Sequence, residues 1–516
     1  MAAPIEIRAH GKQMLGMPPA RFLRDYWQKR PLLIRGAFAR FENPVAPNDL
    51  AGLACEELAL ARIVIEESAA HRSSTSFPRE RESTSYQRAV SSRLASPQSD
   101  SRLRGNDVEK GRKDAGKWGK AVDKRIDPPA PASRWILRNG PFAESDFATL
   151  PKTHWTLLVQ DVDKWDADVA ALLQPFDFLP SWRVDDVMIS YAEDGGSVGA
   201  HVDQYDVFLL QGLGRRRWQI SVDPEAPKTF RDDVELRLLR EFAPTHEWVL
   251  EPGDMLYLPP GVPHHGVALG ACMTYSIGMR APSRAELLVD FAETLAESVP
   301  ETSRLTDPDL LPSRGDGEID EAAISRVMGA MPWFGWGDHS SSPASSSRRT
   351  PGSSSLPASS SRRTPGSSSL LRKKSDASQR LERVGNPDSC SGTLDSSLLR
   401  TWFGRFITRY RSAHVVAPNP HPPGESAFAR AIEQGARVRR NPWSRCAWMR
   451  QGRDAVLFVA GDAHACSVRL ARLVAAEPEF VLSAAPTAAR DRAVLRDLVA
   501  AGHLALVRAP RKRSSA

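Results

Sequence analysis

Short apolar runs bounded by Gly, Pro or Asp recur through the middle of the chain and predict β-strands. They cover 155–160, 186–191, 207–210 and 255–258. The last run lies between the turn sequences EPGD and PPG. Apolar runs this short between turn formers are typical of strands rather than helices. The central part of the chain is therefore predicted to be mainly β and to form a barrel.

Apolar residues at helical spacing flank this β region. A short helix is predicted over 19–27, followed by a strand over 31–34. Helical patterns also follow the barrel. They cover 283–296 and 318–331, and closer to the C-terminus a strand-like run at 455–459 precedes a helical pattern at 488–500. The C-terminal part is therefore predicted to be a small α+β module such as a winged helix.

Two stretches have a composition too polar to build a packed core. Residues 72–130 are rich in Ser, Arg and Lys, and residues 339–398 contain two identical copies of PASSSRRTPGSSSL at 343–356 and 357–370. Both are predicted to be disordered insertions. The remaining chain divides into a β-barrel domain (1–71 and 131–282), a helical region (283–338) and a C-terminal domain (399–516).

The net charge of +7 is unevenly distributed along the chain. The two insertions and residues 400–516 together carry 43 Lys and Arg against 20 Asp and Glu. The rest carries 26 basic against 42 acidic side chains. An acidic body attracts basic partners, so the charge favours a Lys/Arg-rich polypeptide as substrate and argues against direct nucleic-acid binding.

Cysteine usage and hydropathy point to a cytoplasmic protein. The five cysteines are scattered and contain no CxxC pair, which favours a reduced compartment. No apolar run of about 18 residues, the length that spans a bilayer, occurs in the sequence. The expectation is a soluble protein without a membrane partner.

The strongest chemical signal is His201-Val202-Asp203. On a strand, residues two apart face the same side, so the imidazole and the carboxylate would both point into the barrel. One further imidazole completes the 2-His-1-carboxylate triad of non-haem iron(II) oxygenases. His264 and His265 follow the PPG turn and face opposite sides of an extended chain, so one of them is expected to reach the metal. Zinc is the alternative metal.

Four segments of the sequence resemble the JmjC-type bacterial ribosomal oxygenases, a branch of the cupin superfamily. They are FLRDYWQKRPLLIRGAF, GGSVGAHVDQYDVFLLQGLGRRRWQI, LEPGDMLYLPPGVPHHG and YSIGMRAP. The resemblance implies a double-stranded β-helix, a helical dimerisation region and a C-terminal winged-helix domain. It also implies Fe(II), with 2-oxoglutarate and O2 as cosubstrates, and hydroxylation of an arginine in the sixteenth protein of the large ribosomal subunit.

The resemblance also implies individual roles. His264 is expected to be the distal metal ligand, and Arg216 to bind the distal carboxylate of oxoglutarate. Alternation along the strand is a weak guide to Arg216, because 212–214 looks like a turn. Ser276 could add a hydroxyl hydrogen bond to the same carboxylate or be an ordinary strand serine.

A substrate arginine needs a carboxylate at the barrel mouth, because an unpaired buried charge is costly. Asp194 is the candidate, and Tyr205 is either a substrate contact or a support of the barrel. The triad alone does not distinguish an arginine hydroxylase from a hydroxylase of another residue or a lysine demethylase. A non-catalytic cupin and winged-helix binding protein is the alternative from a different class.

Overall fold

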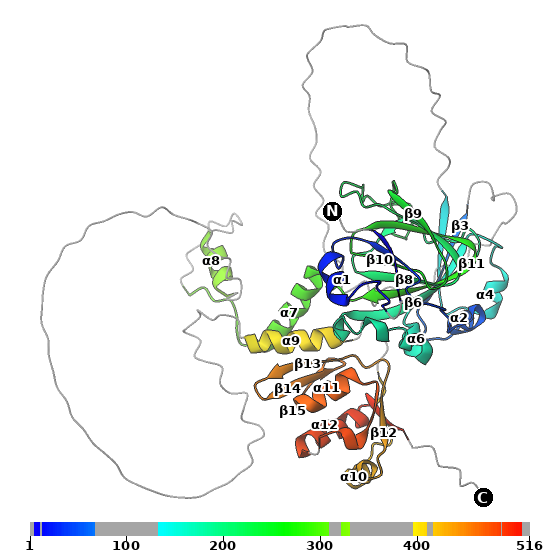
Figure 1. The fold of residues 1–516 in the computed structure, drawn as a ribbon. Helices are drawn as coiled ribbons and strands as arrows, with labels where there is room; N and C mark the ends of the chain where they lie inside the picture. The colour runs from blue at the N-terminus through cyan, green and yellow to red at the C-terminus, as the bar shows by residue number, and fades with distance from the viewer. Residues whose placement is uncertain are drawn as a thin grey trace, which may run out of the picture.

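The computed structural model describes residues 5–10, 13–67, 133–308, 321–330, 396–409, 416–486 and 488–507. The predicted insertion at 72–130 lies outside these residues, as does the predicted insertion at 339–398 apart from its last three positions, where a helix begins at Ser396. A sheet-rich N-terminal part and a smaller C-terminal part are joined by helices (Figure 1). The barrel predicted for the central chain is confirmed.

Eleven strands form one sheet that closes into the barrel, in the order β1-β2-β10-β8-β11-β6-β5-β3-β4, with β7 on β11 and β9 on β8. The two longest strands, β8 and β11, pair antiparallel with each other near the centre of this order. The strands are β1 (Glu6–Arg8), β2 (Leu32–Arg35), β3 (Ala61–Glu67), β4 (Arg134–Asn139), β5 (Trp155–Val159), β6 (Val184–Ala192), β7 (His201–Val202), β8 (Val207–Ile220), β9 (His246–Leu250), β10 (Met255–Leu258) and β11 (Pro263–Met279).

Alternation along β6 separates a core face from a cavity face. Val187 and Ile189 are fully buried in the main hydrophobic core. Asp186, Met188 and Ser190 line a cavity on the opposite side. This is the period of two that a strand imposes on its side chains. The sequence of β6 thus supplies apolar side chains to the core and polar side chains to the cavity.

The core outside the cavity is rich in aromatic rings that fix the N-terminal helix against the barrel. Phe22 of α1 packs edge to face on Tyr257 of β10, with ring centroids 5.0 Å apart. Phe176 packs on Phe208 of β8 at 4.9 Å. The helices around the barrel are α1 (Pro19–Asp25), α2 (Pro47–Leu53), α4 (Glu144–Ala148), α5 (Val162–Trp165), α6 (Ala167–Ala171) and the short 3-10 turns η2 (Gln174–Phe176) and η3 (Ser181–Arg183).

Helices α7 (Arg284–Ser298), α8 (Glu321–Ala330) and α9 (Ser396–Thr408) come next in the chain, and α7 and α9 lie between the two parts (Figure 1). Ser283 caps α7 by accepting a hydrogen bond from the Glu286 amide, as N-cap serines do. The predicted helices over 283–296 and 318–331 are therefore confirmed within two or three residues at each end. Helix α9 begins at Ser396, ahead of the predicted domain start at 399.

The C-terminal part combines helices with two small sheets, as the winged-helix prediction requires. One sheet has the order β16-β12-β17 and the other β13-β14-β15. Its elements are α10 (Glu425–Glu433), β12 (Arg437–Arg440), β13 (Cys446–Gln451), β14 (Asp454–Val459), β15 (Asp462–Ser467), α11 (Val468–Ala476), β16 (Glu479–Val481), η4 (Leu482–Ala484), α12 (Ala489–Ala500) and β17 (Leu504–Val507). It has its own hydrophobic core.

No helix in the described part of the chain is both long enough and apolar enough to cross a bilayer.

The expected turn at 212–214 is wrong, because β8 runs unbroken from Val207 to Ile220. Gly214 has φ +61° and marks a bulge where the register with β11 shifts. A Cβ at this position would lie 2.1 Å from the Ala271 carbonyl oxygen. Glycine thus permits the close approach of backbone that keeps the strand continuous.

Replacing Gly214 with Ala is expected to destabilise the fold by roughly 2–5 kcal/mol, because overpacking adds to the strain of a positive φ. Thermal unfolding measures the loss. Gly270→Ala is the matched control, since Gly270 also has a positive φ (+77°) but no atom lies within 4 Å of the place that its added Cβ would take. Equal losses for the two variants would contradict the close approach at Gly214.

Candidate active site

A cavity of about 550 Å³ opens inside the barrel. Its wall comes mainly from β3, β6, β7, β8 and β11, with contributions from the loops 203–205 and 236–238. A cavity of this size in the mouth of a β-barrel is suited to a small ligand together with one side chain of a larger one.

His201, Asp203 and His264 lie together in the wall of this cavity. Their ligand atoms are all within 4.8 Å of one another. Asp203 Oδ2 is 3.9 Å from His201 Nε2 and 3.6 Å from His264 Nε2. His264 faces His201 directly in the antiparallel pairing of β11 with β7. Sheet register therefore brings together residues that are far apart in sequence.

The backbone orients both imidazoles for metal binding. His201 Nδ1 lies 2.9 Å from the Gly199 carbonyl oxygen, and His264 Nδ1 lies 2.9 Å from that of Val262. A carbonyl oxygen only accepts, so Nδ1 carries the proton in each ring and Nε2 offers its lone pair. Burial, reinforced by the neighbouring His201, lowers the pKa of His264 to about 4. His264 is thus neutral near pH 7, which is the form that binds metal.

His265 faces away from this group. Its Nε2 lies 3.0 Å from Ser197 Oγ. The structure therefore brings His264 and not His265 to His201 and Asp203, in line with the choice that the resemblance implied. Two imidazole nitrogens and one carboxylate on one side of a cavity fit a divalent transition metal with open coordination positions.

Arg216 is a buried cation in the same cavity. Its side chain is 2% exposed, and burial lowers its pKa. It donates to Ser190 Oγ (3.4 Å) and to the Gly266 carbonyl (3.2 Å) and lies over the Trp218 ring. Within the described residues, no carboxylate lies at ion-pair distance from it. An unpaired buried guanidinium is costly unless an anion occupies the space beside it.

Hydroxyl groups surround this cation. Ser190 on β6 contacts Arg216 directly, although its sequence position alone did not mark it out. Thr274 lies opposite Ser190 in the pairing of β6 with β11 and also lines the cavity. Ser276, two residues further on the same face of β11, lines the cavity too. Ser276 therefore faces the predicted ligand space, as Thr274 does.

The two predicted substrate contacts lie in different places. Tyr205 lines the cavity beside Asp203 and is 43% exposed. Burial of its hydroxyl, with Asp203 and Asp186 nearby, raises the pKa of Tyr205. Asp194 is not among the residues that line the cavity; its carboxylate accepts a hydrogen bond from the Gly270 amide at 2.7 Å. Asp194 thus holds the backbone of β11 at Gly270, beside the point where the register of β11 with β8 shifts.

Asp186 is a carboxylate in the cavity wall that sequence reasoning missed. Burial, together with Asp161, Asp185 and Asp163, raises its pKa to about 7. Its Oδ2 accepts a hydrogen bond from the Asp161 amide at 3.2 Å, and no basic side chain of the described chain is at ion-pair distance. In the sequence, Asp186 stands two residues before Met188 and four before Ser190, so a strand places all three side chains on one face. The cavity therefore contains a carboxylate and a guanidinium that each lack a partner of opposite charge among the described residues.

A buried network fixes the segment that follows the metal strand. Asp206 is fully buried and accepts hydrogen bonds from Gln28 (2.9 Å), Arg183 (3.1 Å) and the Tyr257 hydroxyl (2.7 Å). The Asp203 carbonyl accepts from the Gly261 amide at 2.8 Å. The carboxylate of Asp203 is thus carried by a segment held at both ends.

Replacing Asp203 with Ala is expected to weaken Co(II) binding by more than about 100-fold. Loss of a residue that only contacts a metal ligand costs up to about 100-fold, and loss of a ligand itself should cost more. The change in the visible absorption of Co(II) on titration measures it. Asp194→Asn is the matched control and should bind Co(II) as the unmodified protein does. Retained affinity in Asp203→Ala would contradict the metal site.

Comparisons with known proteins agree with this arrangement. A sequence model of the JmjC domain matches residues 171–287, and one of the ROXA-like winged helix matches residues 392–505. The chain is 35% identical to the ribosomal protein uL16 3-hydroxylase of Escherichia coli over 310 residues, covering 60% of this chain and 65% of that one. It is 32% identical to a probable ribosomal oxygenase of Haemophilus influenzae, covering 52% and 51%. The aligned part thus spans less than two thirds of each of these relatives.

Solved structures extend the likeness over the whole fold. The X-ray structure of E. coli ycfD matches with a TM-score of 0.61 and 26% identity, covering 96% of this chain and 99% of that one. A structure of the same ribosomal oxygenase in complex with cobalt and 2-oxoglutarate matches with a TM-score of 0.59 and 26% identity, covering 95% and 99%. The chain thus contains a JmjC domain followed by a ROXA-like winged helix, and it is similar to ribosomal oxygenases over its whole fold.

Proposed function

We propose that the protein is an iron(II)- and 2-oxoglutarate-dependent oxygenase that hydroxylates an arginine side chain of the ribosomal protein uL16. The observation that carries the proposal is one cavity containing a two-histidine, one-carboxylate group and an unpaired buried arginine. The relative from E. coli is named as a uL16 3-hydroxylase, and a ribosomal oxygenase from E. coli has been solved with cobalt and 2-oxoglutarate. Both support the same chemistry here.

In this proposal His201, Asp203 and His264 hold the metal, through the two Nε2 atoms and a carboxylate oxygen. With oxoglutarate and O2, bound iron(II) supplies the oxidant that inserts one oxygen atom into a C–H bond, releasing succinate and carbon dioxide. Fe(II) is favoured over zinc because the cavity also offers a cation for a cosubstrate carboxylate. No side chain is required as a general base, so the work of the protein is to bind, orient and exclude water.

Arg216 binds the distal carboxylate of oxoglutarate in this proposal. Its guanidinium can present parallel N–H donors to a carboxylate, which gives both energy and direction. Ser190 and Ser276 provide hydroxyl groups on the cavity side of β6 and β11. The carboxylate would neutralise a charge that the described residues leave unpaired, so binding recovers part of the cost of burying Arg216.

We assign the substrate cation to Asp186 in place of Asp194. Asp186 lies on the cavity face of β6, four residues before Ser190, and has no cationic partner in the described part. Four residues of strand span about 13 Å, which separates the site for the substrate cation from Arg216. Met188 lies between them, and Tyr205 lines the same cavity. An arginine side chain of the substrate that enters the cavity would thus place its guanidinium beside Asp186.

The exposed face of the winged-helix domain carries arginines of the kind that bind nucleic acid, but they have partners within the protein. Arg439 forms an ion pair with Glu479 at 2.9 Å, and Arg440 donates to the carbonyls of Val474 and Ala475 at the end of α11. Trp443 packs on Trp165. These contacts support a structural role for this face rather than a role in binding RNA or DNA.

We further propose the domain division given above, with a homodimer formed through the helical region and a cytoplasmic location with the ribosome. Exposed apolar side chains on α7 and α8 support the dimer: Leu288 is 68% exposed and Ile324 is 44% exposed. Large contiguous patches of exposed apolar side chains are rare on monomeric proteins and mark interaction surfaces.

The principal rivals are an oxygenase that acts on another residue, by hydroxylation or lysine demethylation, and a non-catalytic binding protein. A hydroxylase of a neutral residue would have no need of an unpaired carboxylate, so Asp186 favours a cationic side chain. A binding protein would have no need of the metal group beside Arg216.

Incubation of the protein with Fe(II), oxoglutarate, O2 and uL16 is expected to add the mass of one oxygen atom to an arginine of uL16. Tandem mass spectrometry detects the modified residue. The Asp203→Ala variant, which lacks a metal ligand, is the control and should add nothing. Succinate released without modification of uL16 would keep the oxygenase and reject the substrate; no succinate at all would favour the binding protein.

Replacing Asp186 with Asn is expected to raise KM for an arginine peptide of uL16 by roughly 30-fold or more, because truncating one side of a buried charge pair costs about 2–5 kcal/mol. Steady-state kinetics measure it, with the KM for oxoglutarate as the internal control. Asp194→Asn should leave the peptide KM within about twofold, since asparagine can still accept from Gly270. A larger rise in the peptide KM for Asp194→Asn than for Asp186→Asn would assign the substrate cation to Asp194 instead.

The pH dependence follows from the same carboxylate. The pKa of Asp186 is about 7 in the free protein, so the group is largely protonated below that pH and cannot pair with a cation. Peptide KM is therefore expected to fall as pH rises through about 7 in the unmodified protein, and this fall should be absent in Asp186→Asn.

A further inference from the structure

An arginine of the winged-helix domain lines the catalytic cavity. Arg445 Nη2 donates to the Asp185 carbonyl at 3.0 Å and also contacts the Asp185 carboxylate. The two residues are 260 positions apart in the chain. The side chain of Arg445 is 13% exposed and that of Asp185 is 24% exposed. Asp185 directly precedes Asp186 at the start of β6, so this contact is made next to the proposed site for the substrate cation.

The position of Arg445 is fixed by its own domain. Its carbonyl accepts from the Ala460 amide at 3.0 Å, beside the pairing of β13 with β14. The buried Ser444 precedes it and lies 2.9 Å from His503. The guanidinium is therefore presented from a rigid edge of the winged-helix domain and not from a free loop.

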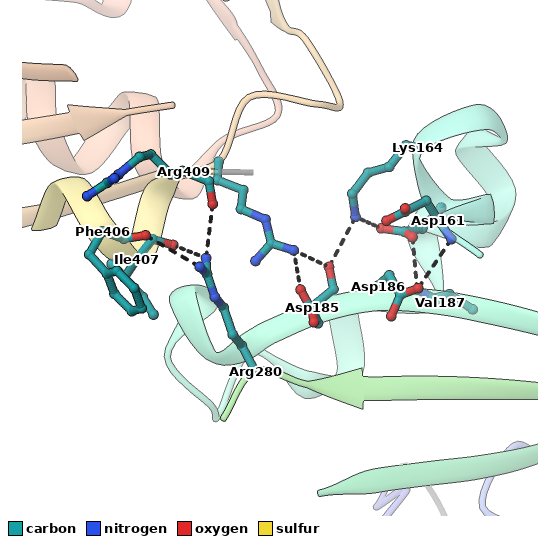
Figure 2. A network of polar contacts seen from close by, with 11 residues as sticks. Asp161, Lys164, Asp185, Asp186, Val187, Arg280, Phe406, Ile407 and Arg409 are labelled. Carbon is teal, nitrogen blue, oxygen red and sulfur yellow. Dashed lines mark hydrogen bonds and ion pairs between the residues drawn. The ribbon is translucent and has the colours of Figure 1, made fainter. Parts of the chain in front are cut away.

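Other contacts hold this edge against the barrel. Arg280, which is 3% exposed, follows β11 and donates to the carbonyls of Phe406, Ile407 and Arg409 at the end of α9 (Figure 2). A cation is favourable at the C-terminal end of a helix, where carbonyls lack partners. Trp182 packs edge to face on Phe403 at 5.8 Å. The docking of the domain thus carries Arg445 to Asp185.

Carboxylates cluster at the start of β6, where Asp161, Asp185 and Asp186 line the cavity. Asp161, Asp163, Asp185 and Asp186 lie together, with Lys164 bound to Asp163 and to the Asp185 carbonyl (Figure 2). Asp163 accepts from the Val187 amide at 2.9 Å and so is occupied by the backbone of β6. Like charges this close oppose one another's ionisation. A cation on Asp185 therefore favours the ionised form of its neighbour.

We propose that Arg445 is a positioning residue for the substrate: by pairing with Asp185 across the domain interface, it leaves Asp186 as the carboxylate that receives the substrate cation. The inference rests on the proposed function and names a further determinant of that site. Arg445 has two effects in this arrangement. It fixes the backbone at the start of β6, and it prevents Asp185 from competing with Asp186 for the substrate cation.

A separation of roles follows. The metal group and Arg216 are built entirely from the barrel, on β7, β8, β11 and the segment after β7. Loss of Arg445 should therefore weaken the binding of a cationic substrate and leave the oxoglutarate reaction intact. A residue needed only for folding would affect both.

The experiment compares full-length Arg445→Met, Arg445→Lys, Asp185→Asn and the double variant Asp185→Asn/Arg445→Met. Each is loaded with Co(II) and oxoglutarate, and the affinity for a fluorescent arginine peptide of uL16 is measured by anisotropy. Arg445→Met is expected to weaken binding about tenfold, and the double variant to bind within about threefold of Asp185→Asn alone, because residues in contact are not additive. Arg445→Lys keeps the charge and should be intermediate.

The pH midpoint of peptide binding gives a second readout. The charged or titratable groups that face Asp186 are Asp161, Asp163 and Lys164 from the α5 segment, Asp185 from its own strand, Tyr205 after β7, Arg62 of β3 and Arg445. Arg445→Met removes the cation that binds Asp185, so the pH midpoint of peptide binding should rise in this variant. In the double variant, which also lacks the charge of Asp185, the midpoint should return toward that of the unmodified protein.

Arg496→Met is the control, because the ion pairs of Arg496 with Glu425 at 3.7 Å and with Asp497 at 4.0 Å are exposed and lie within the same domain, and such pairs contribute little. Its peptide affinity should be unchanged. Equal affinities in all variants, an additive double variant or a wild-type protein that does not bind the peptide would each overturn the inference. Succinate release without peptide tests the oxygenase separately, so its loss in the wild type indicates failure of the proposed function.

Discussion

The antiparallel pairing of β11 with three partners is the constraint on which the site depends. The first residues of β11 pair with β7, its whole length pairs with β8, and its second half pairs with β6. One strand thereby sets His264 opposite His201 and Thr274 opposite Ser190. Because a shift by one residue would turn every side chain to the other face, register alone decides whether the two histidines, Asp203 and Arg216 share a cavity. Gly214 permits the bulge that keeps this register along β8.

The barrel holds charged groups in unlike ways. Asp206 is fully buried and has three donors, so it is satisfied by the fold itself and acts as a structural support. Arg216 and Asp186 face the cavity without an opposite charge from the described residues. Buried ions that lack a partner lower stability. Their retention is explained if ligands of opposite charge supply the missing partners, an anion for Arg216 and a cation for Asp186.

Local patterns in the sequence predicted most of the fold and the metal group. The H-x-D pattern depends only on the two-residue period of a strand, so His201 and Asp203 could be paired without knowledge of the sheet. The choice between His264 and His265 and the role of Arg216 came from the family resemblance, because both depend on register. Gly212 to Gly214 looked like a turn because a glycine-rich run has that composition, whereas the close approach to Ala271 that requires Gly214 is a tertiary contact. Asp186 and Arg445 were missed for the same reason: an Asp-Asp pair does not reveal which carboxylate faces inward, and no local pattern joins residues 260 positions apart.

The distribution of charge along the chain has a counterpart inside the cavity. The barrel part is acidic overall, and carboxylates gather around Asp186 at the start of β6, whereas Arg216 lies on the stretch of β8 that pairs with the first half of β11. Low-dielectric walls concentrate such fields. A cationic group is attracted to the carboxylates around Asp186 and repelled near Arg216, while a dicarboxylate is repelled near Asp186 and stabilised near Arg216. Under the proposed function, the cationic substrate and the dicarboxylate would therefore bind at separate ends of one cavity.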